Sequence, residues 1–230
     1  MSPKAAFDLA ALDIAGTTVH EGGTVYRVLR SVIEDRVGAP LPDDVLERWT
    51  GTSKREAVSG LLREMSGRDQ GAAVEATYSA FTAALLDAYR AAPPTLIRGA
   101  ADSLRRLRSD GVRVVLQTGY DREVAETVLD AAGWRVGRDV DGLVTSDEVP
   151  ASRPAPYLVF HAMQLAGAQD VRRVVVAGDT RNDVLAGINA GAGLVAGVLS
   201  GEGIPQTFWP FAGRFGFHVI ADVGELISLI

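Results

Sequence analysis

Apolar residues gather along the chain in short runs that end at turn-forming residues. The first run covers residues 5–15 and ends at Gly16 and two threonines. Later runs of the same kind cover residues 112–116, 174–177, 194–199 and 218–220. Continuous apolar runs of this length are typical of strands that are buried on both faces of a parallel sheet.

Helical patterns separate these runs in the second part of the chain. The predicted helices cover residues 100–109, 122–132, 156–166 and 182–190. A glycine closely follows each of them, and glycine readily takes the left-handed conformation that ends many helices. Strands that alternate with helices from about residue 95 onward predict an α/β fold, a doubly wound, Rossmann-like domain with a mostly parallel sheet.

Residues 24–92 have a different pattern, because helical segments follow one another there without a strand between them. The predicted helices cover residues 25–37, 42–49, 54–65 and 72–89. Pro93 and Pro94 end this region, since proline cannot continue a helix. We therefore predict a core domain formed by residues 1–19 and 94–230, and an inserted small α-helical cap domain formed by residues 20–93.

Charge and composition narrow the possible functions. Lysine and arginine number 23 against 29 aspartates and glutamates, a formal net charge of -6, so nucleic acid is not an expected partner. The absence of cysteine excludes disulfides, a thiolate zinc site and a cysteine nucleophile. Asp8 and Asp13 interrupt the apolar start, and no 18-residue apolar stretch follows, so we expect a cytoplasmic protein with no membrane contact.

Polar residues of useful chemistry follow several of the predicted strands. In a doubly wound sheet, ligands bind beyond the carboxyl ends of the strands, so these residues are candidates for one shared site. They are Asp13, Ala15, Gly16 and Thr17 after the first strand, Thr118, Gly119 and Tyr120 after the second, Asp179 and Asp183 after the third, and Arg153 in the loop before residue 156.

Three carboxylates in one site would repel each other unless a cation lay between them, and oxygen ligands with room for water suit Mg²⁺. A threonine hydroxyl, backbone N–H groups of glycine-rich turns and an arginine can bind the oxygens of a phosphoryl group. A carboxylate beside them can act as nucleophile through an aspartyl-phosphate. Each aspartate could also be a turn former or helix cap, and residues 178–183 could simply cap the next helix, but their joint placement favours a site.

Four segments, DIAGTT, LQTGY, the loop around Arg153 and GDTRND, resemble in this order the motifs of the haloacid dehalogenase superfamily. The resemblance covers essentially the whole predicted core. It implies a hydrolase in which Asp13 is the nucleophile, Thr118 binds the phosphoryl group and Arg153 supplies a cation. The implied metal ligands are Asp13, the Ala15 carbonyl and Asp179, with Asp183 as a further ligand or a neighbour of the ligands.

Ala15 and Lys54 indicate one branch of this superfamily. Most of its phosphatases carry a second aspartate at the position of Ala15, where it acts as general acid, and a methyl group cannot do this. The segments DIAGTTV, GTSK, TGYDRE, DEVPASRP and GDT resemble the phosphonoacetaldehyde hydrolase, or phosphonatase, family. That family has alanine here and uses a cap lysine to form a Schiff base with the substrate aldehyde. The resemblance implies this role for Lys54, which follows Gly51 in the predicted cap.

Two positions depart from that family, which has a histidine where Ala57 stands and a methionine where Thr50 stands. Lys54 could also be an ordinary surface lysine at the start of a helix, with the preceding GTS as turn and cap. A late segment rich in aromatic residues could be a hydrophobic seal, a subunit contact or ordinary core packing. It contains Phe208, Trp209, Phe211, Phe215 and Phe217.

The sequence therefore predicts a Mg²⁺-dependent hydrolase that cleaves a small phosphonate such as phosphonoacetaldehyde. The alternatives are a small-molecule phosphomonoesterase similar to phosphoglycolate phosphatase, and a protein that binds a phosphorylated ligand without catalysis. The expected partner is a small phosphorylated or phosphonate metabolite, and the helical cap could support a homodimer. The candidate substrate-binding residues are Gly16, Thr17, Gly51, Gly119 and Tyr120.

Overall fold

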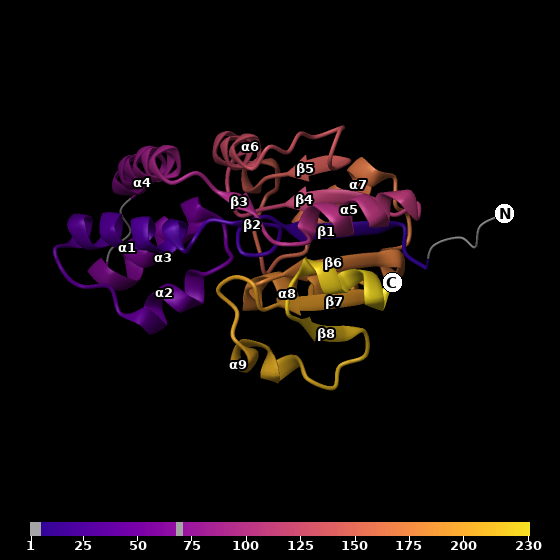
Figure 1. Cartoon of the computed structure of the whole chain (residues 1–230). Helices are drawn as coiled ribbons and strands as arrows, with labels where there is room; N and C mark the ends of the chain where they lie inside the picture. The colour runs from indigo at the N-terminus through magenta and orange to yellow at the C-terminus, as the bar shows by residue number, and fades with distance from the viewer. Residues whose placement is uncertain (1–5, 68–70) are drawn as a thin grey trace.

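A parallel sheet forms the centre of the computed structural model, which describes residues 6–67 and 71–230 (Figure 1). Within these residues the sheet has six strands in the order β5-β4-β1-β6-β7-β8, and every neighbouring pair is parallel. The strands are β1 (Leu9–Asp13), β4 (Arg113–Gln117), β5 (Gly142–Val144), β6 (Val174–Gly178), β7 (Leu194–Val198) and β8 (Phe217–Ile220). The predicted mostly parallel α/β fold is therefore confirmed.

Helices cover both faces of this sheet, which explains the continuous apolar character of its strands. On one face, α7 and α8 pack on the central strands, and on the other face α5 packs on β4 and on the C-terminal η4. Successive residues of β1 point to opposite faces, so Leu9 and Ala11 join one apolar cluster and Ala10 and Leu12 the other. The elements around the sheet are α5 (Ala100–Ser109), α6 (Arg122–Ala131), α7 (Tyr157–Ala166), α8 (Arg181–Ala190), α9 (Pro205–Phe208) and η4 (Val223–Leu229).

Between β1 and α5 the chain leaves the sheet and forms a group of helices that lies to one side of it (Figure 1). These helices are α1 (Thr24–Val37), α2 (Asp43–Trp49), α3 (Lys54–Ser66) and α4 (Gly71–Ala91). Leu29, Ile33, Leu61, Phe81 and Leu85 are fully buried among them. The antiparallel pair β2 (Val19–His20) and β3 (Thr95–Leu96) joins the outgoing and returning segments. The division into two domains at residues 20 and 93 stays a prediction.

The predicted elements agree with the structure over most of their length, with three differences. The first strand is shorter than predicted, because the amides of Thr17, Thr18 and Val19 all turn back to the Ile14 carbonyl. The start predicted for that strand, Ala5, lies outside the described residues. The sequence pattern also missed β5 and the β2–β3 pair, which are too short to give a periodic signal.

The aromatic segment near the C-terminus has two kinds of position. Phe208 and Phe211 are buried and pack against Phe217, with ring centroids 6.5 and 5.6 Å from it. Trp209 and Phe215 are exposed. The interpretation as core packing is therefore confirmed for Phe208 and Phe211, whereas Trp209 and Phe215 are not part of the core. Among the described residues, no helix is both long enough and apolar enough to cross a membrane.

Candidate active site

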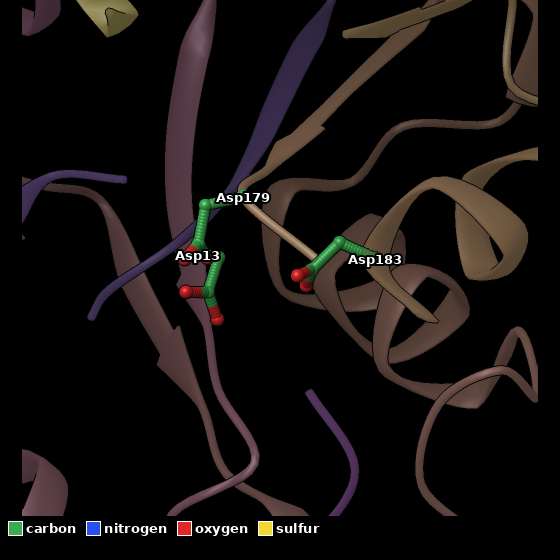
Figure 2. A group of neighbouring side chains, drawn as sticks. All are labelled: Asp13, Asp179 and Asp183. Carbon is green, nitrogen blue, oxygen red and sulfur yellow. The ribbon is translucent and has the colours of Figure 1, made fainter. Parts of the chain in front are cut away.

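The carboxyl ends of β1, β4 and β6 open into a cavity of about 400 Å³ that the helical insertion helps to enclose. Figure 2 shows Asp183 pointing from the first turn of α8 toward Asp13, the last residue of β1, and Asp179, which follows β6. The predicted site residues on the cavity wall are Asp13, Ala15, Gly16, Gly51, Lys54, Thr118, Gly119, Tyr120, Arg153, Asp179 and Asp183. Residues far apart in the sequence therefore meet in one place, as the topology of a parallel sheet predicts.

The three carboxylates lie close enough to share one cation. One oxygen from each of Asp13, Asp179 and Asp183 lies within 4.8 Å of the others, and all three residues are buried. Arg153 bridges two of them, with Nη2 2.8 Å from Asp13 Oδ1 and Nη1 2.7 Å from Asp183 Oδ1. A single guanidinium cannot balance three buried carboxylates, so the site has an excess of negative charge.

Burial, together with this excess charge, raises the pKa values of Asp13 and Asp179. Burial raises the pKa of Asp13 to about 7, although Arg153 lowers it and Asp183 raises it further. The pKa of Asp179 is also raised well above its usual value, by burial and then by the charges of Asp13 and Asp183. A divalent cation between these groups would remove the repulsion, and an all-oxygen donor set suits a hard ion.

Asp183 caps a helix and also lines the cavity. Its Oδ2 accepts hydrogen bonds from the Thr180 backbone and hydroxyl, which caps α8. Its Oδ1 is turned to the cavity and, among the described residues, accepts no hydrogen bond of suitable geometry, although Arg153 lies nearby. The helix cap thus fixes the carboxylate and leaves one oxygen available to a ligand.

Glycines allow the chain to approach Asp179 closely. Asp179 Oδ2 accepts a hydrogen bond from the Glu202 backbone at 2.7 Å. A Cβ atom on Gly16, which has a φ of 80°, or on Gly201 would overlap with this carboxylate. Thr17 is not on the cavity wall, because its hydroxyl donates instead to Asp179 Oδ1 at 3.5 Å. The structure shows a contact of Thr17 with this aspartate, and its contact with substrate stays a prediction.

The turn after β4 contacts the helical insertion. The Thr118 hydroxyl accepts a hydrogen bond from the Tyr120 backbone at 3.1 Å. The Gly119 carbonyl accepts one from the Lys54 backbone, also at 3.1 Å. A side chain on Gly119 would overlap with the Thr52 carbonyl. The glycine therefore permits the contact that brings Lys54 to this edge of the sheet.

Lys54 is not a surface residue, because only 5% of it is exposed. Its Nζ donates to the Thr52 carbonyl at 3.1 Å and lies 5.0 and 5.7 Å from the ring centroids of Tyr26 and Tyr120. Burial lowers its pKa to about 8, against the opposing effect of the Asp13 charge. Lys54 is also the first residue of α3, where the helix dipole disfavours a positive charge.

Several residues of the cavity wall were not identified from the sequence. Glu21, Tyr26 and Glu202 line the cavity with the predicted residues. The Tyr26 hydroxyl accepts a hydrogen bond from the Gly51 backbone at 2.9 Å, which fixes its ring beside Lys54. Nothing in the local pattern distinguished Tyr26 from other residues on an amphipathic helix, because periodicity does not say which helix face meets a cavity.

Comparison with known proteins gives matches to hydrolases. A sequence model described as haloacid dehalogenase-like hydrolase matches residues 7–191. A phosphonoacetaldehyde hydrolase from Parabacteroides distasonis is 38% identical over 109 residues, which are 45% of this chain and 40% of that protein. The alignment thus spans less than half the length of that relative. A phosphonoacetaldehyde hydrolase from Paraburkholderia phytofirmans is 27% identical over 200 residues, which are 83% of this chain and 74% of that protein.

The fold also has a close counterpart among solved structures. A hydrolase from Pseudomonas syringae matches with a TM-score of 0.79 and 22% identity, and the alignment covers 96% of both chains. At this identity the likeness concerns the fold. The match to the family model shows more than the fold, because the matched residues 7–191 include the segments around Asp13, Thr118, Arg153 and Asp179. The chain therefore belongs to the haloacid dehalogenase-like hydrolases.

Proposed function

We propose that this chain is a Mg²⁺-dependent phosphonatase that cleaves a small phosphonate aldehyde such as phosphonoacetaldehyde. The observation that carries the proposal is the shared cavity of Asp13 and Lys54, a carboxylate nucleophile and a buried amine that come from different parts of the fold. A phosphatase needs only the first of these groups. The lowered pKa of Lys54, about 8, and the names of the two relatives support the second role.

The donor set fits Mg²⁺, because it consists of oxygen atoms on a cavity wall with room for water. The residues that would hold the ion are Asp13, Asp179 and Asp183, together with the Ala15 carbonyl. When bound, the ion supplies positive charge that reduces the repulsion between these carboxylates and the oxygens of the substrate.

The amine of Lys54 would act first, by forming an imine with the substrate aldehyde. Protonated, this imine is an electron sink at the carbon next to the carbon–phosphorus bond. Heterolysis of that bond in the free aldehyde would leave an enolate, which is a poorer leaving group than the neutral enamine. The imine thus removes the need for a general acid at position 15, where Ala15 has only a methyl group.

Asp13 would then attack phosphorus. Its Oδ1 lies 2.8 Å from Arg153 Nη2, so the guanidinium orients the carboxylate and can also bind the oxygens of the phosphoryl group. A bond forms between Asp13 and phosphorus, and the electron pair of the carbon–phosphorus bond moves into the iminium to give an enamine. Water then hydrolyses the aspartyl-phosphate. The enamine takes up a proton at the carbon that carried phosphorus and becomes the imine of acetaldehyde, and hydrolysis of this imine releases acetaldehyde and restores Lys54.

Borohydride reduction in the presence of phosphonoacetaldehyde tests this proposal. We expect a stable adduct on Lys54, identified by peptide mass spectrometry, and release of phosphate in the absence of borohydride. Lys4 is the only other lysine in the sequence, so Lys4→Arg serves as a matched control and should keep both results. If Lys54 stays unmodified and Lys54→Ala keeps full activity on phosphate monoesters, the alternative phosphomonoesterase function is correct.

A further inference from the structure

Three side chains behind Lys54 form a continuous chain of hydrogen bonds. The hydroxyl oxygens of Tyr120 and Tyr89 are 2.8 Å apart, and the Tyr89 hydroxyl donates to Glu21 Oε2 at 3.2 Å. Both tyrosines are only 2% exposed. Tyr120 and Glu21 line the active-site cavity, while Tyr89, from α4, lies behind the wall. This series of hydrogen bonds therefore begins and ends at the cavity and passes through the protein interior between these two points.

The hydrogen bonds of this chain have one direction. The Glu21 carboxylate also accepts hydrogen bonds from the backbone N–H groups of Gly23 and Val25, each at 2.9 Å, which hold it in place. Because a carboxylate only accepts, Tyr89 donates to Glu21, and its oxygen is then left to accept the hydroxyl proton of Tyr120. The Tyr120 oxygen keeps its lone pairs for a donor in the cavity.

The surroundings keep both tyrosines protonated. Burial raises the pKa of Tyr89, and the charge of Glu21 raises it further, while Arg27 opposes this. Burial also raises the pKa of Tyr120, with smaller contributions from Tyr89, Glu21 and Tyr26. Each hydroxyl can therefore pass on one proton only while it receives another, as in a concerted relay.

Imine formation at Lys54 requires such proton transfer. A lysine ammonium and an aldehyde combine to an iminium and one water molecule, so two of the three ammonium protons must move to the carbonyl oxygen. Ala15 lies two residues after Asp13, and Ala57 lies three residues after Lys54. Neither residue can transfer the protons, because the side chain of alanine is a methyl group. Tyr120, whose ring centroid lies 5.7 Å from Lys54 Nζ, is a wall residue whose hydroxyl is linked through Tyr89 to a carboxylate.

We propose that Tyr120, Tyr89 and Glu21 form a proton relay for imine formation at Lys54. This inference rests on the proposed function. The Tyr120 oxygen takes a proton from the Lys54 nitrogen while its own proton moves to Tyr89 and that of Tyr89 moves to Glu21. The carboxyl of Glu21, on the wall of the same cavity, returns this proton to the carbonyl oxygen and so resets the relay. A second passage delivers the second proton, and the oxygen leaves as water. Tyr120 is then a catalytic residue, and Tyr89 a positioning residue that acts through it.

Tyr89→Phe tests the relay, because it removes one hydroxyl from the middle of the chain and keeps the buried ring. The measurement is the rate at which borohydride traps the Lys54 adduct of phosphonoacetaldehyde, between pH 6 and 9.5, together with kcat and KM. We expect trapping and kcat to fall roughly 100-fold at pH 7, which is within the usual contribution of proton transfer, with KM nearly unchanged. The loss should shrink as pH rises, because the free amine and hydroxide then replace the relay.

Two further variants separate this role from a structural one. Glu21→Gln keeps an oxygen that accepts the hydrogen bond from Tyr89 but cannot take up a proton, so it should show the same loss. Tyr78→Phe is the matched control, because Tyr78 also donates to a carboxylate, that of Asp121, but lies outside the cavity wall. It should keep the wild-type rate and pH profile, and melting temperatures should show that all variants are folded.

The outcomes distinguish this inference from the proposed function. If the wild type forms the trapped adduct and Tyr89→Phe or Glu21→Gln has an unchanged rate and pH profile, the relay is wrong and the phosphonatase function stands. An equal loss in Tyr78→Phe would also overturn the relay, because the effect would then be general. If the wild type forms no adduct and releases no phosphate from phosphonoacetaldehyde, the proposed function fails and the relay fails with it.

Discussion

Replacing Lys54 by methionine should stabilise the folded protein at neutral pH, even though it removes a residue of the proposed active site. The two side chains have similar length, and methionine carries no charge into the buried position. In the wild type, burial disfavours the charged form of Lys54 and lowers its pKa from 10.5 to about 8. The unfolded chain keeps the ordinary pKa, so the lysine binds its proton more strongly when the protein unfolds.

The size and pH range of the effect follow from this pKa shift. A shift of one pKa unit corresponds to about 1.4 kcal/mol, so the shift of Lys54 corresponds to about 3 kcal/mol of unfolding free energy. Below pH 8 both states hold the proton, and the folded wild type bears the full cost. Between pH 8 and 10.5 the folded state releases the proton first, so the wild type gains stability relative to Lys54→Met. Above pH 10.5 the difference due to charge is lost.

Urea unfolding in the presence of a chelator, at pH 7 and at pH 10.5, measures this difference. Lys54→Met should be more stable than the wild type by about 3 kcal/mol at pH 7 and show little of this advantage at pH 10.5. Arg55→Met is a matched control, because Arg55 is the next residue of α3 and its side chain is 55% exposed. Its effect should stay within about 0.5 kcal/mol. A Lys54→Met protein that is no more stable at pH 7 would show that the cavity does not disfavour the ammonium, and would refute this explanation of the lowered pKa.

Three further substitutions test other parts of the site. Asp13→Ala should abolish phosphate release and leave the circular dichroism spectrum unchanged, and clear residual turnover would exclude a covalent aspartyl-phosphate. Asp183→Ala should remove most of the increase in melting temperature that Mg²⁺ produces, and should also cost about 1 kcal/mol through the lost cap of α8. An unchanged response to Mg²⁺ would mean that Asp183 does not hold the ion. Gly51→Ala should lower kcat at least about tenfold and also lower the melting temperature, because a side chain there overlaps with Thr180 and requires a φ of 83°. Full activity of this variant would show that the insertion need not approach the sheet so closely.

The sheet and its strand-end residues could be predicted because a simple rule connects them. Parallel strands bring their carboxyl ends to the same edge, so a polar residue directly after each apolar run is placed without knowledge of any contact. Asp13, Thr118 and Asp179 are in this position, and the structure brings them together. The helices were also predictable, since their apolar periodicity and closing glycines are local features.

The residues of the proposed relay could not be predicted, because their positions depend on how helices pack. Tyr89 is at the end of a long helix and resembles any buried aromatic residue in the sequence. Glu21 precedes α1 and resembles a residue that caps a helix. Only the packing of α4 against α1 brings their side chains within hydrogen-bonding distance. Helix periodicity gives the buried face of each helix but not the partner it meets.

The hydrogen bond from the Lys54 backbone to Gly119, together with that from Asn182 to the Thr50 carbonyl, has a consequence for the timing of the reaction. These bonds fix the amine at the edge of the sheet, so a movement wide enough to admit a substrate from this side would break them and carry the amine away from Asp13. Substrate entry from this side and the reaction between the two groups could then not take place at the same time. Under the proposed function, the amine and the carboxylate would therefore face each other only while these two hydrogen bonds are intact.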